Sequence, residues 1–177
     1  MKKQLYFALV AGLVLFIWQF LSFAALGLHE SSMAYTDKQD ELLEAIDATG
    51  LETGMYYLGR AETASEEDMN MFQEKYEGKR FARLNLMEDN TQDMQVNLIR
   101  GFLVCIVLMF LMYYVYAQQK DASLMQRIRC SIIIGLAIFF MVPYTNFIWF
   151  PQPDIYAHLI DAIVPWTLVG FVAHKMV

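Results

Sequence analysis

The chain has 177 residues, of which 57% are hydrophobic and 15% aromatic, and its mean hydropathy is +0.33. This composition excludes an ordinary soluble domain. The formal net charge is −6, but residues 29–97 hold 16 of the 19 acidic residues against six basic ones, so that segment carries −10 and the rest of the chain +4. An acidic segment argues against binding to nucleic acid or anionic lipid. It suits a solvated surface, a cationic partner or metal cations.

Four apolar blocks of about 20 residues follow one another along the chain. About 20 helical residues cross a hydrocarbon core of ~30 Å, so we predict spans over 4–28, 98–117, 131–150 and 155–173. The first apolar run is too long for a secretory signal peptide, and we expect it to stay as an anchor. Residues 118–130 form a loop, and residues 29–97 form a cap domain. The predicted fold is an all-α four-helix membrane bundle with a small α+β extracytoplasmic cap between spans one and two.

The first span carries polar residues in its apolar run. Gln19 and Ser22 share one helix face, a pattern that commonly makes hydrogen bonds between membrane helices. We interpret them as interhelical contacts. Trp18 lies in the middle of the span rather than at an interface, which indicates helix packing.

The cap contains the signals of two helices and two strands. Thr36 and Gln39 form a capping-box pattern before a helix over 37–48, and Ser65 with Asp68 starts a second helix that Gly78 ends. Adjacent aromatics in 54–60 and alternating apolar residues in 81–86 predict two short strands, and 88–93 is a polar linker. Two strands alone are marginal in water, which favours a partner or a second copy. The alternative is a helical hairpin with poorly ordered connections.

The positions of lysine and arginine give an orientation. Basic residues precede span one, lie between spans two and three, and follow span four, at Lys2, Lys3, Lys120, Arg127, Arg129 and Lys175. The positive-inside rule places these segments in the cytoplasm. We therefore expect a multi-pass protein of the bacterial inner membrane, with both termini cytoplasmic and residues 29–97 extracytoplasmic.

Span four carries the most unusual polar residues. His158 and Asp161 share one helix face, and Pro165 removes the helical partner of the Asp161 carbonyl. Ionisable residues within spans are costly and usually face the bundle interior or a wet cavity. Arg100 on span two and Asn146 on span three lie at comparable depth, and His29 ends span one. We therefore predict a polar cluster of four residues: Arg100, Asn146, His158 and Asp161.

Three interpretations of this cluster stay open. An Arg100–Asp161 ion pair could join the helices, a wet site could hold a proton, metal ion or small polar ligand, or the side chains could extend separately to the interface. His158 and Asp161 supply only two metal ligands, and zinc requires three or four, so we assign no metal site and no cofactor. Pro143 in span three and Pro165 in span four predict kinks, which we attribute to packing.

Other residue types give little further signal. Cys105 and Cys130 lie at different depths, so we expect no disulfide. Met69 and Met71 could bind Cu(I), but no histidine or cysteine accompanies them, which favours apolar filling. No phosphate-binding loop, zinc-protease motif or nucleophilic triad is present, so we expect no enzyme.

Several short motifs appear in one order along the chain: FIWQFLS, DKQDELLEAI, GMYYLGR, and TNFIWF followed by PWTLVG. In these motifs the chain resembles a loosely defined group of small bacterial four-span membrane proteins with no assigned activity. The resemblance implies the topology and implies no activity. Some members have a histidine after the first-span serine where this chain has Phe23, which weakens a metal site based on span one.

These observations leave two functions. The first is an accessory or interaction protein whose acidic cap contacts a protein partner or a second copy. The alternative is a small transporter or binding protein for a cation, proton or metal, centred on His158 and Asp161. The lipid bilayer is the expected surrounding in both cases.

Overall fold

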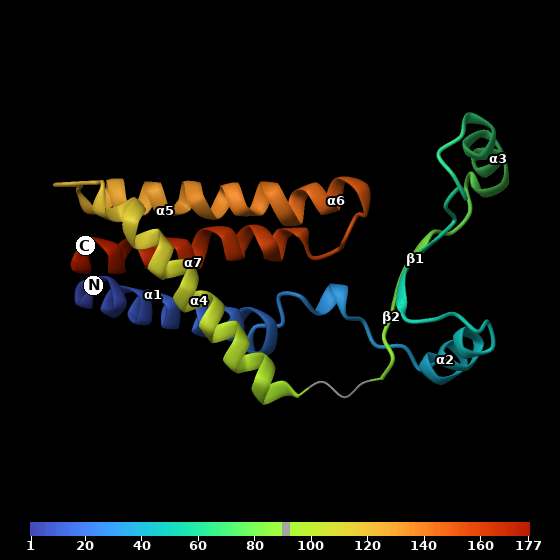
Figure 1. Ribbon diagram of the computed structural model, residues 1–177, viewed down its shortest axis with the longest axis horizontal. Helices are drawn as coiled ribbons and strands as arrows, with labels where there is room; N and C mark the ends of the chain where they lie inside the picture. The colour runs from blue at the N-terminus through green and yellow to red at the C-terminus, as the bar shows by residue number, and fades with distance from the viewer. Residues whose placement is uncertain (90–92) are drawn as a thin grey trace. The chain divides into compact units, whose positions relative to one another are not determined.

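The computed structural model describes residues 1–89 and 93–177 (Figure 1). Within these residues, four helical segments are long and apolar enough to cross a membrane: Lys2–Ala25, Met94–Ala117, Leu124–Trp149 and Ile155–Met176. The prediction of a mainly helical chain with four helices able to cross a membrane is thereby confirmed. Part of the predicted 88–93 linker lies outside the described residues.

The chain divides into two compact units. The first comprises Met1–Tyr35 and Asp93–Val177, and the second is Thr36–Gln92. This division falls inside the predicted 29–97 cap at both ends. His29 belongs to the helical unit because its side chain is buried there, and Met94 already lies in a helix that Asp93 caps.

The helical unit is a series of neighbouring helices (Figure 1). Helix α4 (Met94–Ala117) packs on α1 (Lys2–Phe20), α1 packs on α7 (Ile155–Met176), and α7 packs on α5 (Leu124–Phe139). Both termini lie at one end, where Lys3 Nζ donates to the carbonyl oxygen of Val177 at 3.2 Å. The opposite end is called the distal end below.

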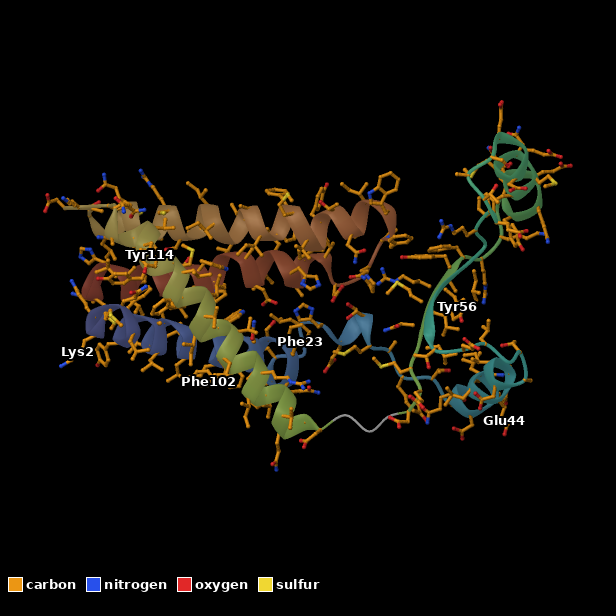
Figure 2. The ribbon with its side chains drawn as sticks, viewed as in Figure 1. Lys2, Phe23, Glu44, Tyr56, Phe102 and Tyr114 are labelled. Carbon is orange, nitrogen blue, oxygen red and sulfur yellow. The ribbon has the colours of Figure 1, made fainter. Side chains whose placement is uncertain are left out.

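Large apolar side chains fill the contacts between these helices. Phe7, Met109 and Val169 are fully buried, and their burial removes apolar surface from the surrounding solvent or lipid. The ring of Phe16 on α1 packs on Phe102 of α4 with 5.3 Å between ring centroids. Tyr114 lies on the exposed face of α4 (Figure 2). Many such exposed apolar residues on these helices are what a membrane protein requires.

Two helices begin earlier than the sequence suggests. Asp93 accepts from the backbone N–H groups of Gln95 and Val96, which starts α4 at Met94 rather than at 98. Ser123 and Gln126 form a capping box, which starts α5 at Leu124 rather than at 131. Residues 124–130, predicted as part of a loop, are therefore helical. Hydropathy alone missed these turns because they are polar, although their caps are visible in the sequence.

The predicted kink at Pro143 coincides with a change of helix type. Residues Phe140–Tyr144 form a π-helical turn, which leads into α6 (Thr145–Trp149). The Thr145 hydroxyl donates to the carbonyl oxygen of Phe140 at 2.7 Å. A π-helical turn accommodates the missing proline N–H without ending the helix. Pro165, in contrast, lies buried within α7.

Buried polar groups join α4 to α5 near the termini. The Arg127 guanidinium donates to the carbonyl oxygens of Tyr116 and, at 2.9 Å, Gln119. These carbonyls lie in the last turn of α4 and just after it, where helical partners run out and a cation is favourable. Tyr116 and Ser131 hydroxyls are hydrogen-bonded at 2.7 Å. Cys105 and Cys130 are free thiols, as predicted.

The second unit contains the predicted order of helix, strand, helix and strand. These are α2 (Gln39–Asp47), β1 (Gly54–Leu58), α3 (Glu66–Tyr76) and β2 (Ala82–Leu86). The strands are antiparallel, with Tyr56 opposite Leu84. Ser65 accepts from the backbone N–H of Asp68 and caps α3 as expected. The predicted capping box at α2 does not form, because the Thr36 hydroxyl accepts from the backbone N–H of Lys38 instead.

Candidate functional site

A change of helix type brings His29 over the end of α1. Residues Leu21–Ala25 form a π-helical turn, and Gly27 follows with φ +60°, a conformation that glycine adopts at little cost. The chain therefore turns sharply and returns toward the bundle. The imidazole of His29 is fully buried there, and the ring of Phe23 stacks on it with 3.9 Å between centroids.

The imidazole of His29 lies between two carboxylates. Its Nδ1 is 2.9 Å from Asp154 Oδ2, and its Nε2 is 2.9 Å from Asp161 Oδ2. An ionised carboxylate only accepts hydrogen bonds, so the imidazole donates through both nitrogens when both acids are ionised. Each acid thus faces one of the two ring nitrogens.

Asp161 receives hydrogen bonds from three side chains of the first span and its extension. Its Oδ1 accepts from Trp18 Nε1 at 2.8 Å and from Ser22 Oγ at 2.7 Å. Its Oδ2 accepts from His29, as described above. Ser22 is fully buried. Residues 2–29, which comprise α1 and its extension, are called the α1 segment below. One carboxylate of α7 thus satisfies three donors from the α1 segment, and these hydrogen bonds join the two segments at the distal end.

His158 is held more loosely than the other residues. Its Nε2 lies 3.5 Å from Asp154 Oδ2, and its ring meets the ring of His29 edge-on with 4.7 Å between centroids. The side chain of His158 is 27% exposed. Its removal would therefore leave the hydrogen bonds of Asp161 and His29 in place.

Asp154 begins α7 and is 5% exposed. Burial raises the pKa of its carboxyl, but the hydrogen bonds from His29 and Ser32 and the nearby His158 lower it, and the net shift is downward. Asp154 is therefore ionised at neutral pH. Its second oxygen, Oδ1, is buried and has no hydrogen-bond partner among the described residues. An unsatisfied buried oxygen of this kind is costly.

The side chains described above form one group, called the distal cluster below: Trp18, Ser22, His29, Asp154, His158 and Asp161. A cavity of about 300 Å³ borders this cluster. Its lining comes from α1, the π-helical turn after α1, α4, α5, Pro143 and α7, and it is mostly apolar. The lining side chains that carry polar atoms are Trp18, Gln19, His158, Asp161 and Trp166. The cavity thus leads from an apolar interior to the imidazole of His158 and the carboxylate of Asp161.

The structure brings together only part of the predicted cluster. His158 and Asp161 lie close to each other, while Asn146 lies on α6. Arg100 is exposed on α4, and no ion pair with Asp161 forms. The three donors from the α1 segment take the place that the sequence suggested for Arg100. Asp161 therefore contacts the first span rather than the second.

The two predicted interhelical residues of the first span contact different helices. Ser22 donates to Asp161 of α7, whereas Gln19 Oε1 lies 3.6 Å from Cys105 Sγ of α4, a weak sulfur hydrogen bond. Pro165 lines the cavity beside the cluster, as does Pro143.

Three residues of the cluster were not predicted to belong to it. The sequence places His29 at the end of span one, Asp154 in a turn, and Trp18 in helix packing. Trp18 gave a usable signal, because an indole N–H in the middle of a span needs an acceptor. The return of His29 depends on the π-helical turn and on Gly27, and neither has a clear pattern in the sequence.

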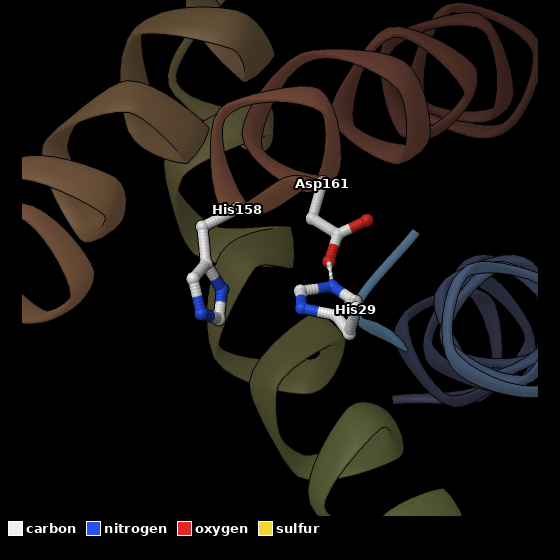
Figure 3. A group of neighbouring side chains, drawn as sticks. All are labelled: His29, His158 and Asp161. Atoms are coloured by element: carbon white, nitrogen blue, oxygen red, sulfur yellow. Dashed lines mark hydrogen bonds and ion pairs between the residues drawn. The ribbon is translucent and has the colours of Figure 1, made fainter. Parts of the chain in front are cut away.

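The cluster contains a group of side chains that could hold a metal ion (Figure 3). One ligand atom from each of His29, His158 and Asp161 can be chosen so that all three lie within 4.8 Å of one another. Only two of these ligands are apparent from the sequence, which therefore predicts no metal site. The third ligand, His29, arrives from the other end of the chain.

Comparisons with family models, with curated proteins and with solved structures found no match for this chain.

Proposed function

We propose that this chain is a cation-binding protein of the bacterial inner membrane, with its cation site in the distal cluster. This is the second of the two functions that the sequence leaves open. Bound cations could be stored, sensed or transported by such a protein. The distribution of lysine and arginine supports cytoplasmic termini and an extracytoplasmic segment after the first span. The distal end would then face the outside of the cell.

One observation carries this proposal: a fully buried imidazole lies between Asp154 and Asp161, 2.9 Å from each. Two acids at this spacing from one ring create a position where positive charge is favourable. The buried Asp154 Oδ1 is a further acceptor without a partner among the described residues.

The proposal predicts that a cation stabilises the protein through Asp161. Thermal unfolding of the purified protein in detergent would be compared across sodium, potassium, magnesium, calcium and zinc chlorides at constant ionic strength. At least one cation should raise the midpoint, because a ligand that binds only the folded state adds about 2.7 kcal/mol at 100 times its Kd.

The matched control uses a second aspartate outside the cluster. Asp121 lies in the turn after α4 with φ 55°, a conformation that asparagine tolerates. Asp121→Asn should keep the cation response and Asp161→Asn should lose it. If no cation changes the midpoint of the unaltered protein, the proposed function is wrong.

A second function, interaction through the Thr36–Gln92 unit, has its own supporting observation. No residue in the described part of this unit, 36–89, is buried. Its exposed apolar residues include Leu42, Leu43, Met69, Met71 and Phe81. A unit without a core gains stability when another surface covers such residues. Because the unit is acidic, we propose a protein partner with a basic surface rather than a second copy.

Photo-crosslinking in cells tests this second function. A photoreactive residue at Leu43, on the apolar face of α2, should give a defined heterologous adduct. The same residue at Glu44, on the opposite face of that helix, should give little. Equal labelling at both positions would contradict a specific interface, and an adduct of two copies would point to a homodimer.

A further inference from the structure

We infer that His29, His158 and Asp161 form a site for one divalent transition-metal ion of the zinc class, with a fourth coordination position reachable from the adjacent cavity. This inference rests on the proposed cation-binding function and specifies its ligand. It assigns three protein ligands from two segments more than 120 residues apart in sequence, the turn after α1 and the first turns of α7.

The distances are close to those a metal requires. His29 Nε2 and Asp161 Oδ2 are 2.9 Å apart, whereas two ligands of a tetrahedral zinc ion with bonds of 2.0–2.1 Å are separated by about 3.3 Å. A shift of a few tenths of an ångström would admit the ion in place of the shared proton. The looser His158 can complete the set by a side-chain rotation, because its contacts are long.

Asp154 gives His29 the carboxylate partner that metal-binding histidines usually have on their second ring nitrogen. It lies 2.9 Å from Nδ1 of His29, on the opposite side of the ring from Nε2. A carboxylate in this position fixes the ring orientation and keeps the Nε2 lone pair available for the metal. Two carboxylates and two neutral imidazoles then balance a divalent charge within the partly buried cluster.

The types of ligand decide which cations fit. Two imidazoles with one carboxylate suit zinc, cobalt, nickel or copper(II), whereas calcium and magnesium prefer six or more oxygen ligands. No cysteine or methionine side chain is among the three ligands, so the set does not favour copper(I).

The cavity indicates that the fourth position is open. Asp161 and His158 line the cavity of about 300 Å³, and His29 does not. An ion held by these three residues could therefore take a water molecule or a small ligand from that side. Three protein ligands with one open position are typical of reactive or exchangeable zinc sites, while structural sites use four.

Cobalt(II) tests the inference because its visible absorption reports coordination. The full chain would be purified without a polyhistidine tag, treated with chelator and titrated with cobalt chloride in detergent. We expect visible bands of four-coordinate cobalt that saturate at one equivalent and disappear when zinc is added. The same bands should shift with azide, which can enter the open position.

Variants distinguish the site from adventitious binding. His158→Gln should abolish the bands without a large loss of stability, since His158 is not needed for the Asp161 contacts. Asp154→Asn should weaken cobalt affinity about 10–100-fold. His174→Gln, which alters an exposed histidine at the end of α7, should change nothing.

Two results would overturn the inference. The first is the absence of saturable cobalt bands in the unaltered protein, and the second is unchanged bands in His158→Gln. If calcium, magnesium or a monovalent cation still raises the unfolding midpoint in an Asp161-dependent way, the cation-binding function stands and only the transition-metal assignment fails. If no cation has an effect, both are wrong.

Discussion

Replacing Asp161 with alanine is expected to lower the free energy of unfolding by about 3 kcal/mol, the lower end for removing one partner of a buried ion pair, because Asp161 itself is only partly buried. The substitution leaves Trp18 Nε1, Ser22 Oγ and His29 Nε2 without their acceptor. These donors lie in the interior of the bundle, where unsatisfied groups are costly. Unfolding would be followed by circular dichroism in mixed micelles as the fraction of denaturing detergent increases.

Arg100→Ala is the matched control for this prediction. Arg100 is exposed and forms no ion pair with Asp161, so its removal should change stability by less than about 0.5 kcal/mol. A large loss in Arg100→Ala together with a small one in Asp161→Ala would contradict the contacts described for the first and last spans.

Replacing Gly135 with alanine should be nearly as damaging, although it adds only a methyl group. That methyl would lie 2.1 Å from the carbonyl oxygen of Ala162 and 2.6 Å from Cδ1 of Trp166. Because the obstacle is backbone, α5 and α7 must separate to admit it. We expect a loss of about 3 kcal/mol, at the upper end for overpacking, since small residues allow this close approach between membrane helices.

Gly101→Ala provides the comparison. The nearest atom to a methyl group there is Phe16 Cε2 at 3.8 Å, an ordinary contact. Alanine favours a helix over glycine by about 1 kcal/mol, so this variant should be as stable as the unaltered protein or more stable. Equal midpoints for the two variants in detergent would show that α5 and α7 do not pack closely at Gly135. Because Asp161 precedes Ala162, Gly135→Ala should also weaken cation binding.

The spans and the elements of the acidic segment could be predicted from the sequence because each depends on a local pattern. Apolar length marks the spans, and Ser65 marks the start of α3. The boundaries of α4 and α5 were missed because hydropathy gives no weight to polar first turns. Asp93 and the Ser123 capping box define those turns instead.

Only part of the candidate site could be predicted from the sequence. His158 and Asp161 stand out because ionisable residues within a span are expensive. Their partners depend on which helices are neighbours, and sequence depth alone could not choose between Arg100 on α4 and the donors of the α1 segment. The contact of α1 with α7 and the turn at Gly27 made that choice. The first is a tertiary contact, and the second is a local turn without a clear pattern in the sequence.

Phe23 has a contact that its sequence pattern does not suggest. In the structure Phe23 stacks on His29, with an angle of 2° between the ring planes. The imidazole that reaches the cluster therefore belongs to His29, six residues after Phe23 in the chain. The ring of Phe23 helps to hold it in place.

The central claim, a transition-metal site formed by two histidines and an aspartate, is tested most directly by X-ray absorption of the zinc-loaded protein. We predict one bound zinc ion whose nearest shell contains only nitrogen and oxygen at about 2.0–2.1 Å. The outer shells should show two imidazole rings, and one of these should be lost in His158→Gln. A shell containing sulfur, or one with oxygen ligands and no imidazole, would contradict it.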